Sequence, residues 1–152
     1  MIRVFGIGNI LLCDDAIGVR VAEKLINKRF GKGIEVIVGE TDYMYCLDKI
    51  DKDDFVVIID STYFNIAPGM VTKLDFKECD MYLDDSFSQH EENLIKVLRR
   101  DFNYINGCLI GIEIGSIDYS LDLSSELESR FKDICREVTS IIRKIERNMI
   151  NA

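Results

Sequence analysis

The chain has 152 residues, of which 47% are hydrophobic, and its formal net charge is −8 at pH 7. This length suits one domain, residues 1–152, with a proper buried core, and it is short for two. The acidic charge argues against nucleic-acid and anionic-membrane partners, which require a basic face. Neither a secretory leader nor an apolar run long enough to span a bilayer is evident, so we expect a soluble, cytoplasmic protein. We also expect it to be a monomer.

The cysteine pattern also indicates a reducing compartment. Five cysteines are scattered along the chain without any C-x-x-C pair, at Cys13, Cys46, Cys79, Cys108 and Cys135. An odd number of dispersed cysteines is not a disulfide framework. We therefore expect buried or half-buried free thiols.

The first predicted unit is a strand, a turn and a helix. The apolar run Ile2–Ile7 is typical of a buried parallel strand and enters a Gly-Ile-Gly-Asn turn. Two aspartates, Asp14 and Asp15, follow, and apolar residues then recur at helical spacing. We expect a helix over residues 15–29, with Asp14 or Asp15 capping its free N–H groups.

This unit suggests a dinucleotide site, but its residues do not fit one. Gly6 and Gly8 match the first two glycines of G-x-G-x-x-G, whereas Leu11 stands where the third belongs. Two carboxylates would also repel a phosphate at this helix start. Because no Lys-Ser or Lys-Thr follows the glycines, a P-loop is excluded as well, and we expect no nucleotide cofactor.

The middle of the chain predicts the centre of a sheet. A strand is expected over residues 34–39, followed by at most a short helix over residues 43–50. Phe55–Ile59 is the most continuous apolar run, as in a central parallel strand that is covered on both faces. Asp60 therefore follows at the carboxyl end of that strand.

The next segment predicts an edge strand, a loop and a helix start. Met70–Phe76 alternates apolar and polar residues as an edge strand does, and the acidic segment Lys77–Phe87 is expected to be a loop. Ser88–Glu91 matches a capping box with Ser88 as N-cap. This places His90, the single histidine, in the first turn of the following helix.

A last strand and a long helix complete the predicted fold. The strand is expected over residues 109–114, and Ser124 or Ser125 should cap a helix whose apolar stripe lies on a sheet. Strands that alternate with helices predict a single three-layer α/β domain. Its sheet should be mostly parallel and twisted, with helices on both faces.

Three groups of side chains then become candidates for one site. Ligands of open α/β sheets bind beyond the carboxyl ends of the strands, where Asp14, Asp15 and Asp60 are expected. Carboxylates together with the imidazole of His90 would suit nickel, zinc or manganese. The alternative is that the aspartates only cap a helix or satisfy a loop, and that His90 is structural.

Other hydrolytic sites fit poorly. His90-Glu91-Glu92 lacks the second histidine of the zinc-protease motif H-E-x-x-H. A serine triad lacks its G-x-S-x-G elbow, and no cysteine stands in a recognisable catalytic signature.

The run Gly6–Gly18, which reads GIGNILLCDDAIG, resembles the opening motif of the hydrogenase maturation proteases, G-x-G-N-x-L-x-x-D-[DE]-x-x-G. The match continues through the strand that ends at Asp60, the turn Ala67–Gly69 and the histidine at position 90. It covers nearly the whole chain in order.

The resemblance implies an endopeptidase that removes a C-terminal extension from the large-subunit precursor of a nickel-iron hydrogenase after nickel insertion. The metal-binding residues of the family fall on Asp15, Asp60 and His90. Nickel is then carried by the precursor, and these side chains complete its coordination. Asn9 and Asp14 are expected to support the site, and the motif assigns no catalytic residue.

One segment departs from the family pattern. Many members carry a G-G-T-x-G loop associated with substrate recognition, which corresponds here to Gly39-Glu40-Thr41-Asp42-Tyr43. Gly39 and Thr41 match the pattern, whereas Glu40 and Asp42 are acidic replacements. Two alternatives therefore stay open: a module that senses a metal-loaded partner without cutting it, and a peptidase for a different protein.

Overall fold

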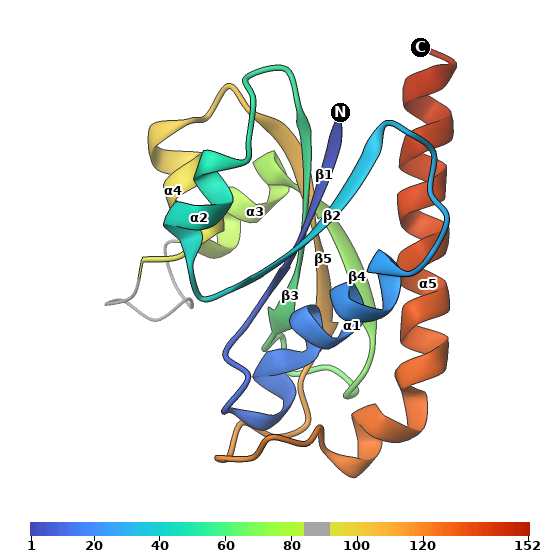
Figure 1. Cartoon of the computed structure of the whole chain (residues 1–152). Coiled ribbons are helices and arrows are strands. Elements are labelled where there is room, and N and C mark those ends of the chain that lie inside the picture. The colour runs from blue at the N-terminus through green and yellow to red at the C-terminus, as the bar shows by residue number, and fades with distance from the viewer. Residues whose placement is uncertain (84–91) are drawn as a thin grey trace.

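The computed structural model describes residues 1–83 and 92–152. Figure 1 shows the chain from its blue N-terminus to its red C-terminus. The elements, in chain order, are β1 (Ile2–Ile7), the 3-10 turn η1 (Cys13–Ala16), α1 (Ile17–Ile26), β2 (Ile34–Glu40), α2 (Tyr43–Asp48), β3 (Phe55–Thr62), β4 (Val71–Asp75), α3 (Phe76–Leu83), α4 (Leu94–Asp101), β5 (Asn106–Glu113) and α5 (Ser125–Ile150).

The strands form one sheet in the order β2-β1-β3-β5-β4. All neighbours are parallel except β4, which pairs antiparallel with β5 at the edge. The central position of β3 and the edge position of β4 confirm the two strand predictions. Because β1, β2, β3 and β5 run the same way, their carboxyl ends meet at one edge of the sheet.

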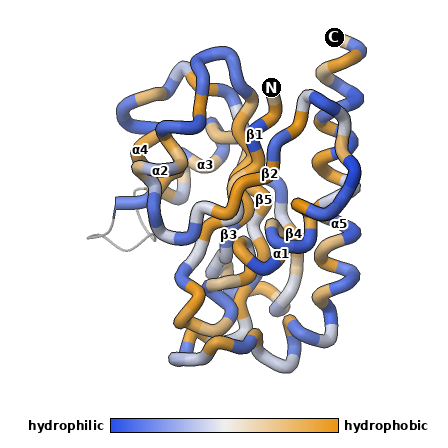
Figure 2. The backbone as a smooth tube through the Cα atoms, viewed as in Figure 1, coloured by the Kyte–Doolittle hydropathy of each residue, from blue (hydrophilic) through white to orange (hydrophobic). Residues whose placement is uncertain are grey.

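Helices cover both faces of the sheet, as predicted (Figure 1). Helices α1 and α5 pack on one face over a core that includes Val57 and Ile110, and α2, α3 and α4 pack on the other over Phe5 and Ile58. Figure 2 shows the central strands as hydrophobic. The fold is thus an α/β arrangement of three layers.

The long helix α5 follows its sequence pattern closely. Ser124 is its N-cap, and its side chain accepts a hydrogen bond from the backbone N–H of Leu127. The predicted stripe is buried from Leu127 to Ile145, with Phe131 partly buried, whereas Met149 is 44% exposed. The stripe therefore ends one turn before the helix does.

Two predictions around α3 and α4 were wrong. Residues 76–83 form a helix instead of starting the predicted loop, because Phe76 and Cys79 lie one turn apart and are both buried. Helix α4 begins at Leu94 with Asn93 as its N-cap, so its first turn does not contain His90. The predicted capping box, residues 88–91, lies outside the described residues.

The five cysteines are free and buried, as expected. Within residues 1–83 and 92–152, no helix combines the length and apolar character that crossing a membrane requires.

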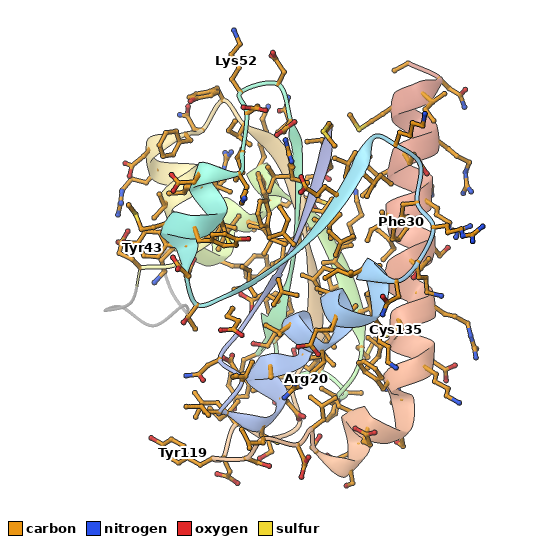
Figure 3. The ribbon with its side chains drawn as sticks, in the orientation of Figure 1. Arg20, Phe30, Tyr43, Lys52, Tyr119 and Cys135 are labelled. Carbon is orange, nitrogen blue, oxygen red and sulfur yellow. The ribbon has the colours of Figure 1, made fainter. Side chains whose placement is uncertain are left out.

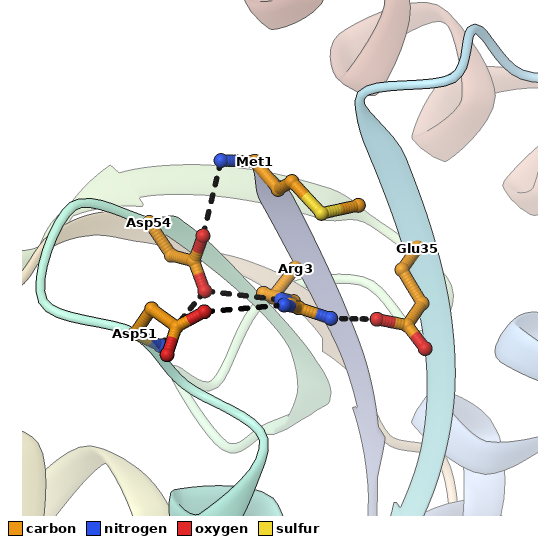
Figure 4. A network of polar contacts seen from close by, with 5 residues as sticks. All are labelled: Met1, Arg3, Glu35, Asp51 and Asp54. Carbon is orange, nitrogen blue, oxygen red and sulfur yellow. Dashed lines mark hydrogen bonds and ion pairs between the residues drawn. The ribbon is translucent and has the colours of Figure 1, made fainter.

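An ion-pair network joins three segments at the amino edge of the sheet (Figure 4). Arg3 on β1 pairs with Glu35 on β2, and its Nε donates to the Asp54 carboxylate at 3.0 Å, next to the start of β3. Asp54 also accepts from the backbone N–H of Asp51 at 2.8 Å and lies 3.0 Å from the amino group of Met1. This network ties β1, β2 and β3 together at the edge opposite their carboxyl ends.

The network predicts an acid-sensitive contribution to stability. Burial raises the pKa of Asp54, but hydrogen bonds from Asp51, the Met1 amino group and Arg3 outweigh it and leave the pKa below its usual value. The contribution is therefore present at neutral pH and is lost as the pH falls below about 4. Asp54→Asn should lower the free energy of unfolding at pH 7 by about 1–2 kcal/mol, with a smaller difference at pH 3.

Urea unfolding at the two pH values measures this difference. Asp53→Asn, at the exposed neighbouring position, is the matched control and should leave stability nearly unchanged. An equal loss for Asp54→Asn at both pH values would contradict the assignment.

Candidate functional site

Glycines of the opening motif allow the first helix to pack directly on the strand ends. A Cβ atom at Gly8, whose φ is 144°, would lie 1.9 Å from the carbonyl oxygen of Asp15. A Cβ at Gly18 would lie 2.2 Å from the carbonyl oxygen of Ile59 on β3. These contacts exclude larger residues and hold Asp15 beside the end of β3, where Asp60 lies.

A pocket of about 210 Å³ opens at this carboxyl edge of the sheet. Asp15 and Asp60 line it together, so the structure brings these two predicted residues into one place. Glu92 and Asn93 also line it, whereas His90 lies outside the described residues. The full lining is Ile7, Gly8, Asp15, Glu40, Thr41, Tyr43, Asp60, Ser61, Glu92, Asn93 and Leu94.

Hydrogen bonds fix the two carboxylates relative to each other. Asp15 accepts from the backbone N–H of Asn9 at 2.9 Å and from the hydroxyl of Ser61 at 2.8 Å. Asp60 accepts from the backbone N–H of Ser61, also at 2.8 Å. Ser61 therefore contacts both carboxylates. Sequence reasoning missed it, although it follows Asp60 directly.

The pocket is electrostatically unfavourable for its own carboxylates. Burial and the negative charge of Asp15 raise the pKa of Asp60 to about 7, against the opposing effect of the hydrogen bond from Ser61. Glu40 and Glu92 add two carboxylates to the lining, and no Lys or Arg is present among the described residues that form it. Glu92 is paired with Arg100 at 2.8 Å. A bound cation would relieve the repulsion between Asp15 and Asp60.

The raised pKa of Asp60 predicts a loss of stability with rising pH. The folded-state pKa of about 7 lies above the ordinary value of 3.8, so the fold favours the protonated carboxyl, and stability falls as the pH rises from about 4 through 7. Asp60→Asn removes the charge but keeps an acceptor for Ser61. It should raise the free energy of unfolding at pH 8 by on the order of 3 kcal/mol and have little effect at pH 4.

Denaturant unfolding of both proteins across this pH range provides the measurement. Asp48→Asn, at an exposed position of α2, controls for the change in net charge. A difference between wild type and Asp60→Asn that stays constant from pH 4 to 8 would refute the prediction.

Asp14 does not cap α1, contrary to the prediction that Asp14 or Asp15 does. The N-cap of α1 is Ala16, and it has no side-chain capping bond, because the turn η1 separates the aspartates from the helix start. The fully buried Asp14 carboxylate instead accepts from the backbone N–H groups of Gly115, Ser116 and Ser124, each at 2.8 Å. It supports the site by holding the loop between β5 and α5.

A second buried carboxylate, Glu113, has the same kind of role and was missed. It ends β5 and accepts from the Thr62 hydroxyl at 3.0 Å and from the backbone N–H groups of Phe64 and Ile66 at 2.9 and 3.3 Å. The available signal was its position, because it directly follows an apolar run of its strand, as Asp60 does. Both carboxylates are occupied by donors, which leaves Asp15 and Asp60 as the site pair.

A larger cavity of about 610 Å³ adjoins the first pocket and shares Asp15 and Ser61 with it. Apolar side chains dominate its walls, among them Phe64, Ile114 and the exposed Ile117. Asp15 therefore lies between a small acidic pocket, suited to a cation, and a more apolar groove. Such a groove can accommodate a polypeptide segment next to the cation.

The acidic replacements at positions 40 and 42 have different structural roles. Asp42 is the N-cap of α2 and accepts from the backbone N–H of Tyr45 at 3.0 Å. Glu40 has a φ of 50°, the left-handed region that favours glycine, and it lines the acidic pocket. Thr41 lines this pocket too, whereas a Cβ at Gly39 would lie 2.4 Å from the Cys46 sulfur.

The conformation of Glu40 predicts that glycine is more stable at this position. Glu40→Gly should raise the free energy of unfolding by about 1 kcal/mol, because a left-handed conformation is unfavourable for residues with a Cβ. Glu40→Ala removes the carboxylate but keeps the Cβ, so it isolates the electrostatic part of the change. Thermal unfolding of the three proteins provides the comparison, and equal stability of the Gly and Ala variants would contradict a backbone origin.

Comparisons with known proteins agree with this architecture. A family model described as hydrogenase maturation protease matches residues 19–142. The chain is 28% identical over 149 residues to the hydrogenase 2 maturation protease of Escherichia coli (strain K12), covering 94% of this chain and 91% of that protein. It is 29% identical over 99 residues to the hydrogenase expression/formation protein HupD of Thiocapsa roseopersicina, but this match spans only about half of that relative, 45% of its length.

Solved structures give the same result. The hydrogenase maturating endopeptidase HybD from Escherichia coli is 28% identical, with a TM-score of 0.79 over 94% of this chain and 92% of that one. The [NiFe] hydrogenase maturation protease HybD from Thermococcus kodakarensis, at 22% identity, shares the fold with a TM-score of 0.72 over 92% of this chain and 97% of that one.

Proposed function

Because this chain belongs to the hydrogenase maturation protease family, we propose that it is an endopeptidase that removes a C-terminal extension from the large-subunit precursor of a nickel-iron hydrogenase. In this proposal nickel is part of the substrate, carried in by the precursor. The protein recognises the loaded metal and then cuts nearby.

The observation that carries the proposal is the shared pocket of Asp15 and Asp60. Two neighbouring carboxylates, without a basic residue among the described side chains that line the pocket, form a binding site for a cation. The pocket opens at the carboxyl edge of the sheet, where α/β proteins bind their ligands.

The available ligands suit nickel, because carboxylate oxygens and imidazole nitrogens bind divalent ions of intermediate softness. Asp60 has one oxygen, Oδ2, without a hydrogen bond from any described residue, and Asp15 keeps lone pairs on both oxygens. We propose His90 as the third ligand. It precedes the pocket residue Glu92 by two residues, which an extended chain spans in about 7 Å.

These ligands also explain why the ion would come with the precursor. Two carboxylates and one imidazole would leave coordination positions open for ligands of the precursor. The adjoining groove, which begins at Asp15, would hold the precursor segment next to the bound nickel.

We place this reaction in the cytoplasm. The five free, buried cysteines support this placement, because free thiols are typical of proteins in a reducing compartment.

The proposal predicts different effects at the two adjacent aspartates. Asp15→Asn should abolish cleavage of nickel-loaded precursor, because it removes a ligand charge. Asp14→Asn should instead lower the free energy of unfolding by about 1–3 kcal/mol, because its amide group presents only one oxygen to three N–H donors. The folded Asp14→Asn protein should retain most of its cleavage activity. Mass spectrometry of the products and denaturant unfolding measure the two effects.

Nickel-free precursor is the control and should remain uncut by the wild-type protein. Stable complex formation with loaded precursor but no shortened product would identify a metal-sensing module in place of a peptidase. Wild-type cleavage by Asp15→Asn would remove Asp15 from the nickel site.

A further inference from the structure

A groove of about 1020 Å³ lies between α1 and α5, on the face of the sheet opposite α2, α3 and α4. It shares no lining residue with the two cavities at the carboxyl edge. The residues that line it are Arg20, Lys24, Lys28, Leu121, Asp122, Leu123, Glu128, Ser129, Phe131, Lys132, Cys135 and Arg136.

Basic side chains line both walls of this groove. Arg20, Lys24 and Lys28 follow one another at four-residue spacing along α1 and just beyond its end, and Lys132 and Arg136 have the same spacing on α5. Among the residues that the structure describes, two acidic ones, Asp122 and Glu128, belong to the lining. This is a local excess of positive charge in a chain whose formal net charge is −8.

Three of these cations are available to a ligand. Arg20 pairs with Glu23 at 3.5 Å and Arg136 with Asp133 at 3.0 Å. The ammonium groups of the exposed Lys24, Lys28 and Lys132 form no ion pair with the part of the chain that the structure describes. Such unpaired charges favour an anionic ligand.

The floor of the groove is apolar. Leu123, Phe131 and Cys135 contribute to it, and each belongs to or packs against the core beneath. Burial raises the pKa of the Cys135 thiol, and the positive charges of Lys28 and Lys24, which line the same groove, partly oppose this. The groove thus combines an apolar base with a basic rim.

One loop connects this groove with the cleft that contains Asp15. Residues 114–118 of the loop line the larger cavity beside Asp15, and residues 121–123 line the groove. Between them Tyr119 is 91% exposed, and Arg20 donates to the carbonyl oxygen of Leu121 at 3.1 Å. Figure 3 shows Arg20 and Cys135 between the two helices and Tyr119 on the loop beyond.

We propose that the groove between α1 and α5 is a docking site for an acidic polypeptide segment that also carries apolar side chains. Carboxylates of the segment pair with the lysines of the rim, and its apolar side chains cover the floor. A nucleic acid is disfavoured, because the acidic surface elsewhere repels a long polyanion. Binding goes beyond the proposed function and does not require cleavage. We assign the segment to the hydrogenase precursor, and only this assignment rests on the proposed function.

A labelled twelve-residue peptide of alternating glutamate and leucine is the probe. It should bind the wild-type protein in fluorescence anisotropy, and its affinity should fall as salt is added. The variant Lys24→Glu/Lys132→Glu should raise the Kd at least tenfold. Lys52→Glu/Lys77→Glu makes the same change of charge at exposed positions outside the groove, so it should raise the Kd less than twofold. Figure 3 shows Lys52 at the far end of the molecule from Arg20.

Three results would overturn the docking site. They are no binding of the acidic peptide to wild type, an equal loss of affinity in the two double variants, and equally tight binding of a thymidine dodecamer. Thermal unfolding checks that all variants are folded.

The cleavage assay separates this inference from the proposed function. With nickel-loaded precursor, Lys24→Glu/Lys132→Glu should lower kcat/KM about tenfold, mainly through KM. If the wild-type protein binds the peptide but cuts no precursor, the docking site is supported and the proposed peptidase activity is refuted. Cleavage by a wild-type protein that does not bind the peptide would refute the groove alone.

Discussion

The close approach of the first turn to the strand ends is the constraint on which the rest of the site depends. The backbone of η1 lies so near Gly8 that no side chain fits between them, and α1 begins against β1 and β3 at Gly18. This packing places the Asp15 carboxylate within reach of the Ser61 hydroxyl, and thereby beside Asp60. The glycines of the opening motif are therefore needed, in the first place, because no larger residue fits between the first turn and the strand ends. These glycines bring two like charges together that would separate in a freely moving loop.

The acidic residues at this edge divide by their hydrogen bonds. Asp14 and Glu113 each accept several N–H groups from a neighbouring loop, and this compensates their burial. Within residues 1–83 and 92–152, Asp60 accepts one such bond, and burial together with the charge of Asp15 strongly raises its pKa. The carboxylates that accept several N–H groups hold the loops in place. The proposed function therefore assigns stability and recognition to different residues of one acidic edge.

Much of this could be predicted from the sequence. Apolar runs predicted the positions of the strands, because a strand that is covered on both faces consists mainly of apolar residues. Asp60 was predicted near the carboxyl end of β3, because it directly follows such a run. Other features depend on contacts between distant segments. The partners of Asp14 lie about a hundred residues further along the chain, so a local capping rule assigned it to the nearest helix. Helix α3 was not predicted, because the acidic residues of this segment obscure the helical spacing of the buried residues Phe76 and Cys79.

The contact between Asp14 and Ser124 also bears on the order of events during synthesis. Asp14 belongs to the strand-turn-helix unit of residues 2–26, whereas its three N–H donors are synthesised only with residues 115–124. Contacts of such large sequence separation form late, after the local elements. Until then the carboxylate stays hydrated and the turn beside Gly8 lacks its anchor. A nascent chain that stops short of α5 would therefore expose an unformed cleft, which delays recognition of any partner until residues 115–124 have been synthesised.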